Sequence, residues 1–219
     1  GGAGPVPKAL GGDREGVARV PEGEVGGVCP GGGGHAGSAR DCIDADKNGI
    51  VEKPVALSMA DADEMGRRAG ERGVKVSACH QNRFNVAVRH ARRAVEEGRF
   101  GRMSHGSVHV RWNRGRAYYH QAPWRGTWAQ DGGCLMNQCI HGIDLLRWMM
   151  GGEVVSVYAQ TRQRFHGYLE AAAVGVAVLT FADGTVATRG GTSHLLPRHP
   201  GDATYLLCSY GTPNHQRQP

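Results

Sequence analysis

Alternating strand-like and helix-like segments between residues 50 and 98 constrain the fold of this chain more than any other feature. A short apolar run ends at Ile50-Val51-Glu52, and Ser58 then begins a helical segment with Asp61 at the capping-box position. That segment ends at Gly73, and a second strand-like run and a second helical segment follow it, at 74–77 and 86–97. Strand–helix–strand–helix order is typical of a parallel sheet covered by helices. We therefore predict an α/β unit here.

The pattern changes after Arg102. One strand-like segment and one long helical segment come first, at 107–112 and 134–150. Strand-like runs then follow with little between them, at 154–160, 172–181, 185–190 and 204–210. Ala182-Asp183-Gly184 has the composition of a hairpin turn. The predicted fold class is an α/β partial Rossmann-like domain followed by an α+β domain with an open, mainly antiparallel sheet.

These patterns predict the domain limits. Residues 1–102 are expected to form an incomplete dinucleotide-binding domain. Its first part, 1–27, is expected to be loose because 15 of the 35 glycines lie in the first 50 residues and ordering glycine costs much backbone entropy. Residues 103–210 are expected to form a substrate-binding and oligomerisation domain. The tail at 211–219 is expected to be disordered.

Composition excludes several classes of protein. The net charge is +6, but the arginines are scattered and form no basic stripe, so nucleic acid is not an expected partner. The six cysteines include no CxxC pair, which argues against a zinc ribbon or a small disulfide scaffold and favours reduced thiols. No apolar run approaches the length of a transmembrane helix, and no export signal is visible, so we expect a cytoplasmic protein without membrane contact.

Two glycine-containing motifs suggest other functions. Gly32 to Gly37 matches the GxGxxG phosphate-binding pattern, but five of the seven residues from Gly31 to Gly37 are glycine, so the match has little specificity. Asp44 to Gly49 matches the first half of an EF-hand, which leaves a calcium-binding module as an alternative. Position twelve of that loop, which needs a glutamate, is Val55.

Polar residues follow the predicted strands where parallel sheets bind ligands. Glu52-Lys53-Pro54 ends one strand and Gln81-Asn82-Arg83 follows the next, at the same side of the sheet. A lysine in such a place can relay protons. Asn137, His141 and Asp144 have the spacing of one helical face and are candidates for lining a pocket. Taken alone, His141 is as consistent with a structural histidine as with a base.

Four motifs in order give the sequence a specific resemblance. They are the EKP triplet, the QNR triplet, Tyr118-Tyr119 with the WRGTW run, and DGGxLMNQxxHxxDLL. Over roughly residues 28–200 the chain resembles the glucose-fructose oxidoreductase/inositol dehydrogenase (Gfo/Idh/MocA) family. Within that family it is most similar to the UDP-N-acetylglucosaminuronate 3-dehydrogenases of bacterial polysaccharide biosynthesis.

The resemblance implies roles for particular residues. Lys53 would contact the nicotinamide ribose and the reacting hydroxyl, and His141 would take the hydroxyl proton while hydride leaves to NAD or NADP. Asn137 would orient the sugar. Further substrate contacts would come from Asn82, Arg83, Tyr119 and Arg125. The cofactor contacts would come from Cys29, Pro30, His35, Glu52, Lys53 and Gln81.

The resemblance also implies assembly and an incomplete cofactor domain. In this family the open sheet meets the same face of another subunit, so a homo-oligomer is expected. The strand–GxGxxG–helix unit and the acidic residue that reads the ribose are not visible in the sequence, so we expect weakened NAD binding. The functional prediction is an NAD-dependent oxidoreductase acting on a sugar or UDP-sugar acid. The alternative is a non-catalytic remnant or an assembly protein that associates through its sheet.

Overall fold

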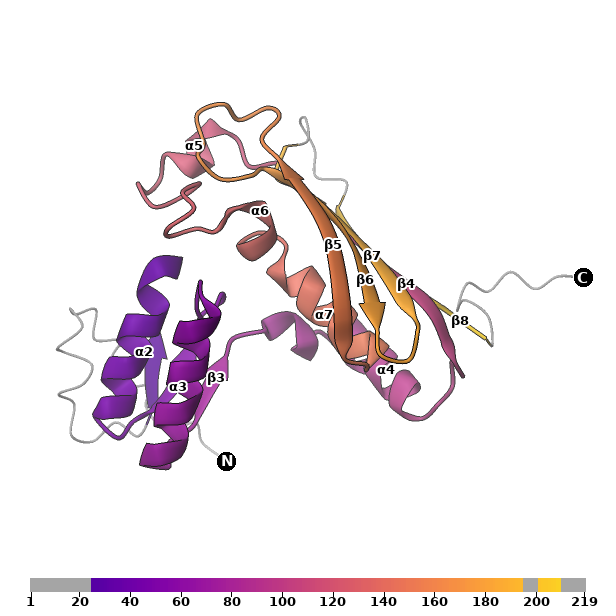
Figure 1. Cartoon of the computed structure of the whole chain (residues 1–219), viewed down its shortest axis with the longest axis horizontal. Helices are drawn as coiled ribbons and strands as arrows, with labels where there is room; N and C mark the ends of the chain where they lie inside the picture. The colour runs from indigo at the N-terminus through magenta and orange to yellow at the C-terminus, as the bar shows by residue number, and fades with distance from the viewer. Residues whose placement is uncertain (1–24, 195–200, 210–219) are drawn as a thin grey trace, which may run out of the picture. The chain divides into compact units, whose positions relative to one another are not determined.

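The computed structural model describes residues 25–194 and 201–209, which divide into two compact units (Figure 1). One unit runs up to Cys79 and the other begins at His80, and each is described by itself. The predicted disordered tail at 211–219 and residues 1–24 of the predicted loose segment at 1–27 fall outside the described residues. The last three residues of that segment, 25–27, belong to strand β1 (Val25–Val28), so they are ordered by pairing with the neighbouring strand.

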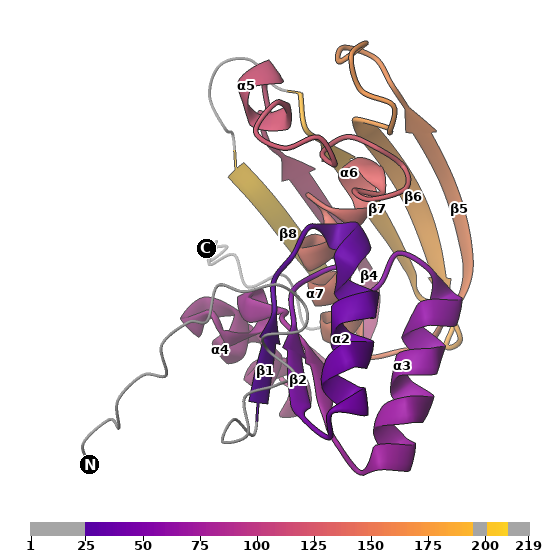
Figure 2. The same cartoon turned by 90° about the vertical axis from the view of Figure 1, so that its left-hand side faces the viewer.

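The first unit is a parallel sheet with connecting helices. Its strands are β1 (Val25–Val28), β2 (Asn48–Val51) and β3 (Val76–Ala78), in the order β1-β2-β3. The short 3₁₀ helix η1 (Gly32–Gly34) and α2 (His35–Asp44) join β1 to β2, and α3 (Met59–Arg72) joins β2 to β3. Figure 2 shows α2 and α3 side by side. The predicted strand–helix alternation is confirmed.

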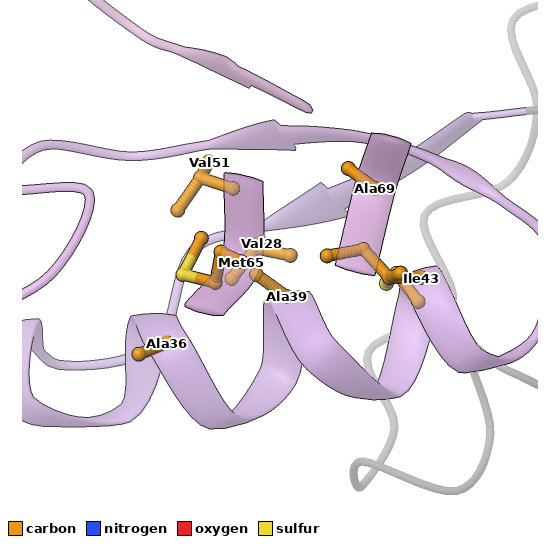
Figure 3. Packing of buried hydrophobic residues seen from close by; sticks show 8 residues of the cluster. Val28, Ala36, Ala39, Ile43, Val51, Met65 and Ala69 are labelled. Carbon is orange, nitrogen blue, oxygen red and sulfur yellow. The ribbon is translucent and has the colours of Figure 1, made fainter. Parts of the chain in front are cut away.

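Small and β-branched side chains allow these helices to pack closely on the sheet. Val28 and Val51 of the strands are buried against Ile43 of α2 and Met65 of α3 (Figure 3). Burying such side chains contributes about 1.5–3 kcal/mol each. The sheet and both helices therefore share one apolar core.

Local interactions define both ends of α3. The Ser58 hydroxyl accepts a hydrogen bond from the Asp61 amide at 3.1 Å and donates to the Asp61 carboxylate at 2.7 Å. This carboxylate interaction replaces the backbone contact that Glu makes in a capping box. Gly73 ends the helix with a φ of 67°, a left-handed conformation that favours glycine. The predicted helix limits are confirmed.

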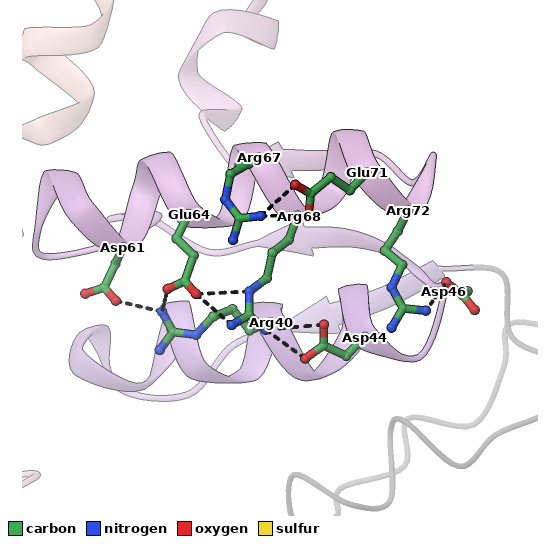
Figure 4. Close-up of polar contacts among 9 residues, drawn as sticks. All are labelled: Arg40, Asp44, Asp46, Asp61, Glu64, Arg67, Arg68, Glu71 and Arg72. Atoms are coloured by element: carbon green, nitrogen blue, oxygen red, sulfur yellow. Dashed lines mark hydrogen bonds and ion pairs between the residues drawn. The ribbon is translucent and has the colours of Figure 1, made fainter.

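Arginines join α3 to α2 through ion pairs (Figure 4). Arg40 contacts Asp61 at 2.7 Å, and Arg68 contacts Glu64 at 2.6 Å and Asp44 at 3.0 Å. Arg72 also pairs with Asp46. Asp44 and Asp46, two carboxylates of the EF-hand-like motif, therefore both have arginine partners. Within residues 25–194 and 201–209, no group of three or more His, Cys, Asp or Glu side chains is placed to hold a metal ion.

The second unit contains a five-stranded sheet. Its strands occur in the order β5-β6-β7-β4-β8, and β4 runs parallel to β7 while the other neighbours are antiparallel. Their bounds are Met103–Arg111 for β4, Val154–Arg162 for β5, Val174–Phe181 for β6, Val186–Thr192 for β7 and Gly201–Cys208 for β8. The predicted hairpin turn joins β6 to β7, with Gly184 at a φ of 83°.

Helix α7 (Ile140–Met150) packs on one face of this sheet (Figure 1). Leu146 and Met150 lie so close to β4 that a Cβ on Gly106 would come within 2.8 Å of each side chain. Gly142 gives the matching close approach from the helix, since its Cβ would meet Val108 at 3.1 Å. Glycine at both positions sets how closely the helix lies on the sheet.

The residues predicted as one helix over 134–150 form two helices, which corrects that prediction. Helix α6 covers Gly133–Met136, and α7 begins only at Ile140. The amides of Gln138 and Cys139 both donate to the carbonyl of Cys134, at 3.1 and 3.0 Å. This tight turn interrupts the helix and places Asn137 outside α7.

The segment between the predicted domains packs with the second unit. The 3₁₀ helix η2 (Gln81–Phe84) and α4 (Val86–Glu96) both lie after the division at Cys79. Arg83 of η2 and Arg92 of α4 both stack on the Trp148 ring in α7, at 5.1 and 5.2 Å. The compact units therefore divide earlier in the chain than residue 102, where the sequence pattern changes.

The fold class is the predicted one. A Rossmann-like parallel sheet comes first, and a mixed, mostly antiparallel sheet with α5 (Arg116–Tyr119), α6 and α7 follows. None of the helices in the described parts of the chain is both long and apolar enough to cross a membrane.

Candidate functional site

In the first unit, the candidate cofactor residues follow the carboxyl ends of the parallel strands. The Glu52 amide donates to the carbonyl of Val28, and the Cys79 amide donates to that of Val51. Glu52 and Lys53 are half-buried directly after β2, and the Lys53 amide donates to the Glu52 carboxylate at 3.2 Å. An ammonium and a carboxylate thus lie where open α/β sheets bind ligands.

His35 holds together the loops that follow β1 and β2. The side chain is 2% exposed, and its two ring nitrogens lie 2.9 Å from the carbonyl of Pro30 and 2.5 Å from that of Pro54. Both partners are carbonyl oxygens, so the ring contacts both loops, and the tautomer decides which nitrogen donates. This geometry gives His35 a positioning role. Cys29, which precedes Pro30 in the chain, is exposed. Direct contact of these residues with a cofactor stays a prediction.

These residues suit the nicotinamide side of a dinucleotide site. Lys53 follows β2 at this edge of the sheet, and the glycines from Gly31 to Gly34 leave the β1–α2 loop without side chains. Gly32 to Gly34 form η1 between β1 and α2, and Gly37 lies inside α2. The Lys53 cation and the glycine loop therefore fit part of an NAD-binding site.

In the second unit, His141 lies in the first turn of α7 and is 9% exposed. Its ring meets that of His80 edge to face, with centroids 5.9 Å apart. His80 Nδ1 in turn lies 3.8 Å from the Asp144 carboxylate. The rings of His141 and His80 and the carboxylate of Asp144 therefore lie next to one another at this part of α7. Such groups can accept and hold a proton.

Asp144 also anchors the QNR segment. Arg83 donates to both of its oxygens, at 2.7 and 2.5 Å, in a bidentate ion pair. This hydrogen bonding raises the pKa of the Arg83 guanidinium, so the cation is retained. The arginine fixes η2 against α7 beside His141, and its predicted contact with the sugar stays a prediction. Gln81 and Asn82 lie in the same short helix, where Gln81 is exposed and Asn82 half-buried.

Asn137 follows α6 and donates a hydrogen bond from Nδ2 to the buried carboxylate of Asp131. The bond fixes the carboxamide four residues before His141, although the two residues do not share a helix. Asp131 was not among the predicted site residues. Its position at the start of the DGG motif is the only sequence signal for it.

Aromatic rings and arginines form a second cluster in this unit. The Tyr118 hydroxyl accepts bonds from Arg125 and, at 2.8 Å, from the Gln138 amide group. Arg125 and Arg114 also stack on the Tyr118 ring, at 4.3 and 5.1 Å. Such a cluster offers cationic and planar surfaces to an anionic ligand. Arg114, Tyr118 and Gln138 were absent from the predicted site.

The neighbouring tyrosine has a different environment. Tyr119 is 5% exposed and donates its hydroxyl to Ser193 at 2.9 Å. Burial raises the pKa of Tyr119 to about 12, so the phenol stays neutral at physiological pH. Tyr119 thus packs in the interior of the second unit, where it holds α5 in place. Its predicted contact with substrate stays a prediction.

Comparison with known families covers most of both units. Residues 88–212 match the family described as the GFO/IDH/MocA C-terminal domain, and residues 17–80 match the oxidoreductase family with an NAD-binding Rossmann fold. The chain belongs to the GFO/IDH/MocA family. The predicted family, fold and cofactor class are confirmed at this level.

Solved structures of two family members resemble the chain closely. The WlbA dehydrogenase from Bordetella pertussis, in complex with NADH and UDP-GlcNAcA, is 32% identical with a TM-score of 0.84, over 90% of this chain and 60% of that one. The corresponding complex from Chromobacterium violaceum is 30% identical with a TM-score of 0.84, over 89% of this chain and 56% of that one.

The curated relatives act on varied substrates. The 2,7-anhydro-N-acetylneuraminate hydratase of Mediterraneibacter gnavus is 33% identical over 48% of this chain and 27% of its own length. The myo-inositol 2-dehydrogenase of Thermotoga maritima is 29% identical over 60% of this chain and 37% of its own length. The chain thus spans well under half of these relatives.

Proposed function

We propose that this chain is an NAD-dependent oxidoreductase that oxidises a hydroxyl of a sugar or a UDP-sugar acid. The family match supports the reaction class, and the likeness to two WlbA dehydrogenases in complex with NADH and UDP-GlcNAcA supports the finer substrate class. The observation that carries the proposal is the buried His141 ring beside His80 and the Asp144–Arg83 ion pair.

In this proposal His141 takes the proton of the reacting hydroxyl. Its imidazole lies in the fixed first turn of α7, and His80 and Asp144 follow it as polar neighbours that stabilise added positive charge. Bound NAD supplies the hydride acceptor. Lys53 and Glu52 are the proposed contacts on the cofactor side. Asn137 presents its carboxamide oxygen, because its nitrogen is used by Asp131.

The test is NADH formation by the purified 219-residue chain. NAD and NADP are offered in turn with UDP-N-acetylglucosaminuronic acid, free glucuronic acid or myo-inositol, and calorimetry measures cofactor binding separately. We expect oxidation of at least one sugar. His141→Ala should lower turnover by about 10²–10⁴-fold, because a positioned base contributes that much.

The matched control is His90→Ala, which changes an exposed histidine of α4 and should leave turnover unchanged. Equal activity in the His141→Ala variant would remove the proposed base. A folded chain that binds cofactor and all three sugars without forming NADH would contradict the oxidoreductase proposal and favour the non-catalytic alternative.

A further inference from the structure

Two buried thiols lie side by side where α6 meets α7. Cys134 Sγ and Cys139 Sγ are 3.4 Å apart, and the side chains are 4% and 0% exposed. The other four cysteines are free thiols elsewhere, at positions 29, 42, 79 and 208. A disulfide has an S–S bond of about 2.05 Å, so these two sulfur atoms need to approach by little more than an ångström.

The backbone already has the closed shape that a bridge requires. The Cys139 amide donates to the carbonyl of Cys134 at 3.0 Å, which brings the two ends of the six-residue turn together. The Cys134 amide is itself held by the carbonyl of Ala172 at 2.8 Å. Both cysteines therefore lie at fixed positions, facing each other across one turn.

A buried cation lies next to the thiol pair. Arg189 of β7 is 2% exposed, and none of its three guanidinium nitrogens has a hydrogen-bond partner among the described residues. A Cβ on Gly191 would lie 2.4 Å from Cys139 Sγ and 3.0 Å from a nitrogen of Arg189. The guanidinium thus reaches the immediate surroundings of the sulfur atoms, and a nearby cation stabilises thiolate over thiol.

We propose that Cys134 and Cys139 are a modification site, at which hydrogen peroxide oxidises the thiol pair to a reversible intramolecular disulfide. A thiolate sulfur at one cysteine attacks a peroxide oxygen, the O–O bond breaks, and hydroxide leaves and is protonated to water. The second thiol then attacks the resulting sulfenic sulfur, the S–O bond breaks, and a second water leaves. Two thiols lose two protons and two electrons, and hydrogen peroxide is reduced to two waters.

Charges around Cys134 set the pH dependence of the first step. Burial raises the pKa of the Cys134 thiol to about 11, while the Arg189 cation lowers it and the Asp131 carboxylate raises it. Tyr119 is the further ionisable neighbour, and it stays neutral over the same range. Oxidation should therefore accelerate as the pH rises from 7 to 9, because the thiolate fraction grows about tenfold per pH unit below the pKa.

The bridge would act on the candidate site through the chain between the two cysteines. That segment includes Asn137, and Cys139 directly precedes α7. Fixing the turn covalently would restrain the Asn137–Asp131 contact and the start of the helix that carries His141. Any effect on turnover rests on the proposed function, whereas formation of the bridge does not.

Peptide mapping tests the proposal directly. Trypsin releases residues 126–147 as one peptide that contains both cysteines, because no Lys or Arg lies between Arg125 and Arg147. The folded chain is treated with hydrogen peroxide, alkylated after denaturation without reductant, and digested. We expect this peptide to be unalkylated and lighter by two hydrogen atoms than the reduced peptide, and reductant should restore full alkylation. The peptide 41–47 with the buried Cys42 serves as the internal control and should remain alkylated.

Two variants separate the pair from its neighbours. Cys139→Ser should abolish the light peptide, and Arg189→Met should slow its formation at pH 7 and change its pH profile. Doubly alkylated peptide 126–147 after peroxide treatment of the folded wild type would overturn the proposal, and so would oxidation of both cysteines to sulfinic acids. The mass of peptide 126–147 from the wild type tests the proposal even if neither variant folds. The same measurement does not depend on whether the chain oxidises a sugar.

Discussion

His166 shows how one buried side chain makes stability depend on pH. Its side chain is buried, with 4% of its surface exposed. The Nδ1 atom lies 2.9 Å from the Tyr168 hydroxyl, within hydrogen-bond distance, and the ring centroid lies 4.7 Å from that of His194. Burial lowers the pKa of His166, and His194 adds to that effect. The folded state therefore favours the neutral ring. Its contribution to stability is complete above the ordinary pKa of about 6.5 and is lost as the pH falls through the lower folded-state pKa.

We predict that the wild-type chain loses thermal stability between pH 7 and pH 5 more steeply than His166→Gln, which cannot become charged. Melting temperatures followed by circular dichroism across this range give the comparison. The exposed His90→Gln serves as the control and should keep the wild-type slope. Parallel slopes for wild type and His166→Gln would show that protonation of His166 is not linked to unfolding.

Gly191 is a second position where a single atom affects stability, because an added Cβ would clash with a neighbouring side chain. An added Cβ would come within 2.4 Å of Cys139 Sγ, in a region where both neighbours are buried. We predict that Gly191→Ala destabilises the second unit by about 1–3 kcal/mol, the usual cost of overpacking a core. Urea unfolding measures the change. Gly167→Ala, whose Cβ would meet nothing within 4 Å, should shift the midpoint little, and an equal shift in both variants would contradict the packing argument.

At the scale of elements, α3 depends on its N-cap. Ser58 is the side chain that satisfies the Asp61 amide. Replacing it with alanine should destabilise the first unit by about 1 kcal/mol. Urea unfolding of Ser58→Ala tests this against Ser77→Ala, an exposed change in β3 of the same unit that should stay within about 0.5 kcal/mol of the wild type. Identical midpoints for the two variants would mean that the cap adds nothing measurable.

The same helix shows what local sequence can predict. Ser58, Asp61 and Gly73 interact with residues a few positions away, so their spacing alone gave the limits of α3. The break between α6 and α7 could not be found in this way. It depends on two amides sharing the Cys134 carbonyl and on a bond from Cys134 to Ala172, a residue far along the chain.

The candidate site was predictable to a similar extent. The family motifs point to Lys53, His141 and Asn137, but they do not show which ring of Tyr118-Tyr119 faces the core. Helix α5 has only four residues, too few for a hydrophobic period to reveal its buried side. Tyr119 is buried against Ser193, and Tyr118 instead meets the arginines.

At the scale of the whole molecule, one face of the second sheet carries exposed apolar side chains. Tyr158, Val176, Val178 and Val186 are 43–70% exposed, and the strand pairing places them on the same face. A patch of this kind is typical of an interface. We propose that it joins two copies of the chain across residues 154–190 in an isologous contact.

We predict that light scattering shows a dimer or larger oligomer at tens of micromolar protein, and that Val178→Glu shifts it toward monomer. Val86→Glu makes the same change at an exposed valine of α4 and should leave the oligomer intact. A soluble wild-type monomer at this concentration would contradict the proposed interface.

The position of β4 has a consequence for the time course of folding. This strand is the first of its sheet to leave the ribosome, yet its two neighbours in the sheet are β7 and β8, with pairs such as His105 with Val186 and Val110 with Asp202. At about 5–20 residues per second, the partners emerge roughly 4–20 s after β4. During that interval a strand with alternating apolar residues has neither neighbour. The nascent chain is therefore most open to chaperone binding, or to pairing with another nascent chain, while residues 112–185 are leaving the ribosome.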